Sequence, residues 1–178
     1  MTPEARVLAE AFIDDPLMAY FWPEPKRRQR ALPLFWHSRV EARRRAGIVD
    51  TASDGEGVTT VLLWERPGCS VPMAEPVSLI RALGAAAPRA LAASRRIESL
   101  RPATPHLYLA VGAALPRARG KGVTSRLVRA RIDAADIDVF VVATNPVSAA
   151  MAEHAGFHTT QELVLENGAT LRGMLRPA

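Results

Sequence analysis

The feature that most constrains the fold is a glycine-containing segment that joins a predicted strand to a predicted helix. The apolar run 106–114 is typical of a strand, and residues 119–122, Arg-Gly-Lys-Gly, separate it from an amphipathic helix predicted over 123–135. Glycines let the backbone approach a ligand closely, and first-turn helix amides have no partners within the helix. Because the helix dipole adds positive charge there, the segment predicts an anion site suited to a pyrophosphate.

Two other phosphate-binding patterns do not fit this segment. The dinucleotide pattern Gly-x-Gly-x-x-Gly needs a further glycine, and none follows Gly122 at that spacing. The P-loop pattern Gly-x-x-x-x-Gly-Lys-Ser/Thr is also absent from the sequence. Taken by itself, the segment is therefore either an anion site of another kind or an ordinary glycine-containing turn with exposed arginines.

The remaining pattern alternates helices and strands, which indicates an α/β (α+β) domain with a central mixed sheet flanked by helices. The length of 178 residues suits a single domain over 1–178. Pro33 is expected to kink or split its helix, because proline removes an amide donor, and Gly84 or Pro88 is expected to break another. Helices are expected over residues 3–13, 25–47, 76–100, 123–135 and 147–155, strands over 48–53, 58–65, 106–114, 138–144, 161–165 and 170–175, a stop at 14–16 and a loop at 66–75.

The composition limits the cellular and chemical setting. The single cysteine, Cys69, excludes an intramolecular disulfide, and the four histidines show no metal-ligand spacing, so we expect no metal. No apolar run approaches the roughly 20 residues that span a bilayer, and the first residues lack a signal-peptide pattern. We therefore expect a cytoplasmic protein without a membrane partner. The net charge of +5 fits either a solvated basic face or an anionic ligand.

Several segments together resemble one family. Residues 119–124, Arg-Gly-Lys-Gly-Val-Thr, resemble the motif Gln/Arg-x-x-Gly-x-Gly/Ala with which the GNAT superfamily of N-acetyltransferases holds the pyrophosphate of acetyl-CoA. Residues 106–109, His-Leu-Tyr-Leu, look like the fourth strand of that family, and residues 153–157 end in its Gly-Phe. Upstream, residues 11–16 and 63–68 resemble the subgroup that includes puromycin N-acetyltransferase. The resemblance implies the GNAT fold, with the first family strand missing.

The family implies where acetyl-CoA binds. The strands expected over 106–114 and 138–144 are to part and admit the pantetheine arm between them. Backbone groups at the end of the first strand would pair with that arm or polarise the thioester carbonyl. Asn145 would contact the coenzyme or cap the next helix. The residues expected to bind acetyl-CoA are Gly112, Ala113, Ala114, Arg119, Gly120, Lys121, Gly122, Val123, Thr124, Ser125 and Asn145.

The sequence departs from the family at two functional positions. The proton for the departing thiolate commonly comes from a tyrosine four residues before the glycine of Gly-Phe, and here that residue is Ala152. Thr124 stands where the family prefers Gly or Ala, so its side chain either crowds the pyrophosphate or binds it. The first departure raises the question of which residue handles protons.

Three side chains are candidates for that catalytic role. Ser148 lies in the first turn of a helix near the expected thiolate, although it equally suits a simple cap. Tyr108 and His106 share one strand face, where either could take a proton from the amine, the alternative being a packed tyrosine and an exposed histidine. Glu65, at a strand end, could also accept an amine proton. The candidates are Tyr108, Ser148 and Glu65.

The expected function is transfer of an acetyl group from acetyl-CoA to the amine of a small molecule, by direct attack in a ternary complex. The loop 66–75 and the amino-terminal helices would build the acceptor cleft. One alternative keeps the fold but takes the acyl group from aminoacyl-tRNA, which would be the sole nucleic-acid partner. Another is a catalytically degenerate acyl-CoA-binding domain, and a homodimer stays open. The cleft residues expected from the helices are Phe12, Asp15, Tyr20, Phe21 and Trp22, with a place in the core as the alternative for Phe12 and Phe21.

Overall fold

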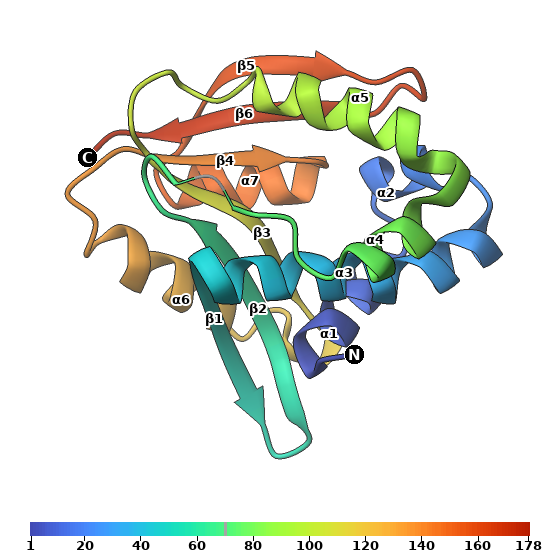
Figure 1. The fold of residues 1–178 in the computed structure, drawn as a ribbon. Helices are drawn as coiled ribbons and strands as arrows, with labels where there is room; N and C mark the ends of the chain where they lie inside the picture. Colours follow the sequence, from blue (N-terminus) through green and yellow to red (C-terminus); the bar gives the residue numbers. More distant parts are fainter. Residues whose placement is uncertain (70) are drawn as a thin grey trace.

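A six-stranded sheet in the order β1-β2-β3-β4-β6-β5 forms the centre of the computed structural model, which describes residues 1–69 and 71–178 (Figure 1). Strands β3 and β4 pair in parallel, and all other neighbours pair antiparallel. The predicted central mixed sheet is therefore confirmed. The strands are β1 (Gly47–Asp54), β2 (Gly57–Glu65), β3 (Leu107–Ala114), β4 (Val139–Ala143), β5 (His158–Val164) and β6 (Thr170–Arg176).

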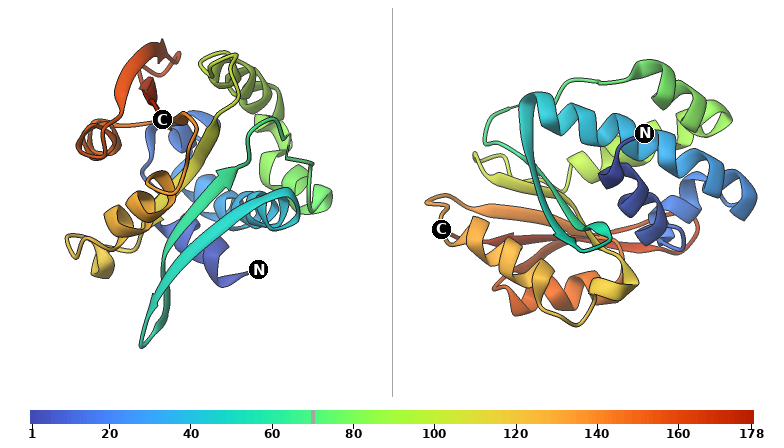
Figure 2. Two further views of the ribbon diagram at one scale, coloured as in Figure 1. Left: turned by 90° about the vertical axis from the view of Figure 1, so that its left-hand side faces the viewer. Right: turned by 90° about the horizontal axis from the view of Figure 1, so that it is seen from below.

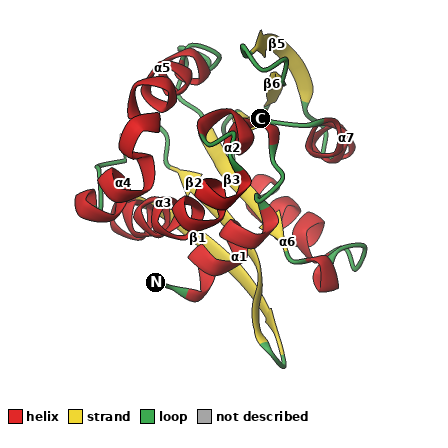
Figure 3. Cartoon of the chain, turned by 90° about the vertical axis from the view of Figure 1, so that its right-hand side faces the viewer, coloured by secondary structure: helices red, strands yellow, loops and turns green. Residues whose placement is uncertain are grey.

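Helices cover both faces of the sheet (Figures 2 and 3). One face carries α1 (Pro3–Ala11), α2 (Pro16–Phe21), α3 (Pro25–Ala46), α4 (Pro76–Leu83) and α5 (Ala87–Glu98), and the other carries α6 (Val123–Ile132) and α7 (Pro146–His154). Residues 1–46 contain the three helices α1 to α3, joined by short turns. Among the described residues, none of the helices has the length and apolar character that a membrane span requires.

Alternating side chains of β2 tie the two layers together. Val61 and Leu63 pack into the core beneath α1 to α5, whereas Leu62 and Trp64 pack into the core beneath α6 and α7. This alternation follows from the two-residue period of a strand. All four side chains are fully buried, so β2 is the strand around which both cores form.

Side-chain caps explain how the amino-terminal helices begin. Thr2 Oγ1 accepts a hydrogen bond from the Ala5 amide at 3.3 Å and caps α1. Asp15 Oδ1 accepts from the Leu17 and Met18 amides at 2.9 and 3.2 Å and caps α2. Helix α2 was not predicted, because Asp-Pro was interpreted only as a stop, whereas the same pair also starts helices.

Helix α3 continues through Pro33, so the predicted split is wrong. Leu32, Phe35, Trp36 and Val40 are all buried on its inner side. Burying one such side chain contributes about 1.5–3 kcal/mol, whereas an interior proline costs about 3 kcal/mol. The packing around Pro33 therefore outweighs its missing hydrogen bond.

Other element boundaries differ only by a few residues. The break between α4 and α5 occurs at Gly84, which has φ 47°, and not at Pro88, which lies in the first turn of α5 where its missing donor costs nothing. Helix α6 ends at Ile132, and β5 begins at His158, three residues before the predicted start. Residue 70, within the loop predicted over 66–75, lies outside the described residues.

Candidate active site

Strands β3 and β4 pair briefly and then separate. Residues 107–109 pair with residues 139–141, and no residue of β3 beyond them pairs with β4. On its other edge β3 stays paired with β2 as far as Ala114, with a register shift that leaves Ala110 unpaired. An extra residue of this kind bends its strand and increases its twist. A gap between the two parallel strands therefore opens at Ala110, as predicted.

The backbone groups of Gly112 and Ala114 face this gap. The Leu115 amide donates to the Thr59 carbonyl on β2 at 2.8 Å, and alternate residues of an antiparallel strand point toward the same neighbour. The amide and carbonyl of Ala113 therefore face β2, while those of Gly112 and Ala114 face the gap. Of the three strand residues predicted to contact the coenzyme through their backbone, Ala113 is thus turned away.

The helix end that follows is open. Gly120 and Gly122 have φ angles of 73° and 69°, the left-handed region that favours glycine. Among the residues that the structure describes, no side chain caps the start of α6, and the first intrahelical bond runs from the Arg126 amide to the Gly122 carbonyl at 3.0 Å. The amides of residues 123–125 precede that bond. The donors that the sequence predicted for a pyrophosphate are therefore available to a ligand.

Basic side chains surround this helix end. Arg119 Nε donates to the Ala114 carbonyl at 3.2 Å, so this side chain folds back onto the end of β3 at the gap. Arg126 Nη1 donates to the Lys121 carbonyl at 3.1 Å. The side chain of Lys121 is exposed, and that of Thr124, three residues later, is half-buried. Two basic residues thus precede the free amides in the sequence and a third, Arg126, follows them and contacts the loop, which favours an anionic ligand.

A cavity of about 640 Å³ lies between α6 and α7, beginning at the same helix end. Its apolar part includes Val147 and Met151, which are 72 % and 48 % exposed on one face of α7. The sequence did not single out these two residues, although their spacing of four on a helix whose buried residue is Ala149 was a usable signal. The cavity is lined by Ser125, Arg129, Pro146, Val147, Ala150, Met151 and His154.

Asn145 and Ser148 form a reciprocal cap at the start of α7. Asn145 Oδ1 accepts from the Ser148 amide at 2.9 Å, and Ser148 Oγ accepts from the Asn145 amide at 3.2 Å. The Ser148 hydroxyl also donates to the Asn145 carbonyl at 2.9 Å. Of the two roles predicted for Asn145, the structure therefore displays the cap. The hydroxyl proposed as an acid at Ser148 is engaged in the same cap.

The predicted acceptor residues on the amino-terminal helices do not gather in one cleft. Phe21 and Trp22 lie in the core, and Phe12 stacks against Trp36 with ring centroids 4.9 Å apart. Phe21 and Trp22 are buried and Phe12 is half-buried in the core beneath α1 to α5. Asp15, which is only 6 % exposed, accepts a hydrogen bond from the Thr144 hydroxyl at the end of β4. The Asp15 carboxylate therefore lies at the end of β4, next to the gap.

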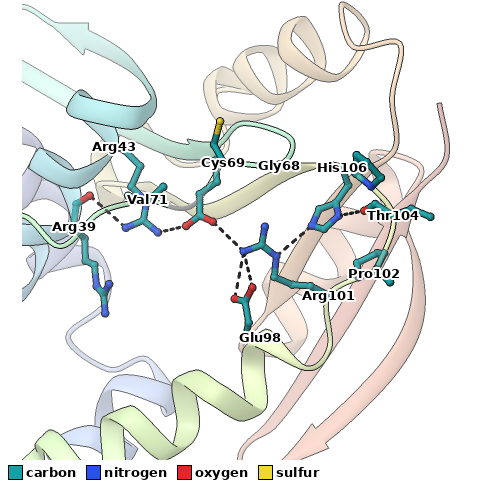
Figure 4. Close-up of a pocket in the computed structure, with 13 residues that line it drawn as sticks. Arg39, Arg43, Gly68, Cys69, Val71, Glu98, Arg101, Pro102, Thr104 and His106 are labelled. Atoms are coloured by element: carbon teal, nitrogen blue, oxygen red, sulfur yellow. Dashed lines mark hydrogen bonds and ion pairs between the residues drawn. The ribbon is translucent and has the colours of Figure 1, made fainter.

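A second cavity, of about 570 Å³, lies at the amino end of β3 (Figure 4). A chain of ion pairs borders it: Arg43 to Glu65 at 2.5 Å, Glu65 to Arg101 at 3.0 Å, and Arg101 to Glu98 at 3.2 Å. Gly68, Cys69 and Val71 of the 66–75 loop also line it, whereas none of the acceptor residues predicted on α1 and α2 does. The charged lining residues come from α3, β2 and the end of α5: Arg39, Arg43, Glu65, Glu98 and Arg101.

Glu65 and His106 are held in this network. Both oxygens of the Glu65 carboxylate accept hydrogen bonds from guanidinium groups, so the predicted base is already occupied by Arg43 and Arg101. His106 is buried, and the expectation of an exposed histidine is wrong, because Arg101 covers it. Since Arg101 Nε can only donate, His106 Nε2 is the acceptor at 3.2 Å, and Nδ1 donates to the Thr104 carbonyl at 2.8 Å.

Tyr108 is a buried residue of β3, two positions after His106. Its ring packs against Phe140, which His106 also contacts, so the two residues share one strand face as predicted. The Arg101 guanidinium lies 4.4 Å from the ring centroid. Burial raises the pKa of Tyr108 to about 12. The hydroxyl is therefore protonated at neutral pH and can donate a proton rather than accept one from an amine.

Comparison with known proteins identifies the family. No family model matches the sequence, and no curated protein matches it. Among solved structures, a histone acetyltransferase HPA2 and related acetyltransferase from Corynebacterium glutamicum is 30 % identical, with a TM-score of 0.76 over 98 % of this chain and 90 % of that chain. Arylalkylamine N-acetyltransferase 2 from Aedes aegypti shares the fold at 16 % identity and a TM-score of 0.55 over 96 % and 91 %. An N-acetyltransferase from Staphylococcus aureus also shares the fold, at 9 % identity and a TM-score of 0.55 over 96 % of this chain and 92 % of that chain. The chain thus belongs to the GNAT family of acetyltransferases.

Proposed function

We propose that the protein transfers an acetyl group from acetyl-CoA to the amine of a small molecule. The observation that carries this proposal is the parting of β3 from β4 at Ala110, directly before the uncapped start of α6. One elongated ligand with a pyrophosphate at one end and an amide-containing arm fits both features. Resemblance to the puromycin N-acetyltransferase subgroup is consistent with a small acceptor.

The residues present suit the coenzyme along its length. The amides of residues 123–125 would hold the pyrophosphate, with Lys121 adding charge. The backbone of Gly112 and Ala114 would pair with the pantetheine arm, once Arg119 releases the Ala114 carbonyl. The cavity between α6 and α7 would receive the remainder, where Arg129 supplies a cation. Both strand residues and helix residues would therefore contact the coenzyme.

Acetyl-CoA supplies a thioester. The amine nitrogen bonds to the thioester carbonyl carbon, and the carbon–sulfur bond breaks. The nitrogen loses one proton, and the sulfur takes one. The protein contributes by holding both substrates together, which removes the entropic cost of their encounter. The backbone amide of Gly112, which faces the gap, would polarise the carbonyl. Among the three predicted catalytic side chains, Tyr108 alone is uncommitted to a cap or an ion pair in the described residues.

Isothermal titration with acetyl-CoA, followed by a thioester-consumption assay on an amine panel, tests this function. Gly122→Glu should abolish binding, because it places bulk and negative charge among the phosphate-binding amides. Gly168→Glu is the matched control, since Gly168 also has a positive φ, 81°, but lies in the β5–β6 turn with open space around it. Equal affinities in the two variants would show that the coenzyme binds elsewhere. Binding without turnover of any amine would show a degenerate acyl-CoA-binding domain.

A further inference from the structure

The cavity at the amino end of β3 holds one guanidinium more than its carboxylates balance. Three arginines and two glutamates line it, and the ion pairs join Arg43 and Arg101 to Glu65 and Glu98. Arg39 forms no ion pair within residues 1–69 and 71–178. In Figure 4 the dashed line at Arg39 ends on its main-chain oxygen, where Arg43 Nη1 donates, and not on its guanidinium.

The surroundings of Arg39 make its isolation costly. Its guanidinium lies 5.0 Å from the centroid of the Phe35 ring, and the side chain is half-buried. Burial, together with the nearby positive charge of Arg43, lowers the pKa of Arg39 to about 10. A solvated surface arginine would show neither effect. A charge kept in such a place is stabilised most directly by an anion that enters the cavity.

Arg101 offers a second set of donors. Its Nε and Nη1 donate to His106, Glu65 and Glu98, whereas its Nη2 has no hydrogen-bond partner among the described residues. The same guanidinium lies over the ring of Tyr108. Arg101 therefore connects the ion pairs that border the cavity to Tyr108, which lies two residues before Ala110 on β3.

The charge balance selects the class of anion. One singly charged carboxylate would balance Arg39 and can accept two parallel hydrogen bonds from a guanidinium. A doubly charged phosphate would leave excess negative charge beside Glu98 and Glu65. The neutral Nδ1–H form of His106, fixed by Arg101, adds no further cation. The cavity therefore suits a carboxylate.

We propose that this cavity binds a carboxylate of the acceptor, with Arg39 as its principal contact, so that the acceptor is an amine that also carries an acidic group. This inference rests on the proposed acetyltransferase function. It assigns substrate specificity to α3 and the end of α5, away from the coenzyme loop. The uncharged part of the acceptor would then lie along Tyr108 toward the gap.

A paired substrate series tests the inference: ω-amino acids of increasing chain length, each beside its own carboxamide. The wild-type protein should acetylate the acids with a KM about 10- to 100-fold below that of the carboxamides, as expected for a charge-assisted bidentate contact. Arg39→Gln should remove this difference by raising KM for the acids alone, and Arg39→Lys should restore it in part. Arg30→Gln, an exposed arginine of the same helix outside the cavity, is the control and should change neither KM.

Equal use of acids and carboxamides by the wild type, or an equal effect of Arg39→Gln on both, would overturn the inference. If no amine is acetylated, the proposed function fails, and titration of the same ω-amino acids into the protein without acetyl-CoA decides this inference separately. Binding that Arg39→Gln abolishes and Arg30→Gln preserves would support the carboxylate site. Absence of binding to the wild type would contradict it.

Discussion

Thr144 donates its hydroxyl hydrogen to Oδ2 of Asp15 at 2.5 Å, across 129 positions of the chain. Asp15 caps α2 with its other oxygen, and Thr144 follows the last residue of β4. One buried carboxylate therefore fixes the start of α2 to the strand end at which β3 and β4 stand apart. The same side chain thus contacts both the start of α2 and the residue that follows β4.

The first prediction concerns the ionisation of Asp15. Burial raises the pKa of Asp15 above its ordinary value of 3.8. The native state then binds the proton more tightly than the unfolded state, so this contribution to stability is present below 3.8 and is lost as pH rises through the raised pKa. Asp15→Asn, which keeps a capping side chain, should remove this dependence. Urea unfolding across that pH range should show the free energy of unfolding of the variant rising relative to that of the wild type as pH rises. A difference in this free energy that does not change with pH would contradict the assignment.

A second prediction concerns proton supply at Tyr108. Tyr108→Phe keeps the ring that packs on Phe140 but removes the hydroxyl, so kcat should fall by about 10²–10⁴-fold, the usual contribution of general acid catalysis. KM for acetyl-CoA and the midpoint of thermal unfolding should stay near wild type. Because the pKa is about 12, ionisation of this tyrosine should not limit kcat at neutral pH. An unchanged kcat in the variant would exclude Tyr108 as the acid.

The cap at α7 gives a third prediction. Ser148→Ala removes one half of the reciprocal cap with Asn145 and should lower the free energy of unfolding by about 1 kcal/mol. Its kcat should remain close to wild type, because the hydroxyl is used by the cap. Denaturant unfolding and steady-state kinetics on the same preparation separate the two roles. A large loss of kcat at unchanged stability would instead make Ser148 catalytic.

A fourth prediction concerns the ion pairs around Glu65. Glu65→Gln leaves the guanidinium groups of Arg43 and Arg101 without their buried partner and should destabilise the fold by about 3–5 kcal/mol. Glu162→Gln is the control, since it breaks an exposed pair with Arg172 and should cost no more than about 1 kcal/mol. Denaturant unfolding measures both. Similar losses in the two variants would show that the Glu65 network adds little.

Much of the fold was predictable because its signals are local. The alternation of β2, the turn between β5 and β6, and the glycines before α6 depend on residues close together in the sequence. The loop before α6 was predictable for the same reason: free amides and left-handed glycines follow from the chain itself.

Long-range packing decided the features that were missed. Asp15 starts α2 because the chain returns to pack on the sheet, and His106 is buried because Arg101 folds over it. The register shift at Ala110, which turns the backbone of Ala113 toward β2, depends on the partner strand. The cavity at Arg39 is lined by residues of α3, β2 and the end of α5, which are distant in the sequence, so no local sequence pattern predicts it.

A crystal structure of the protein with acetyl-CoA tests the central claim most directly. The account predicts the pyrophosphate within hydrogen-bond distance of the amides of residues 123–125 and the pantetheine arm between β3 and β4, beside Gly112 and Ala114. A pyrophosphate bound away from the start of α6, or an arm outside the gap, would contradict it.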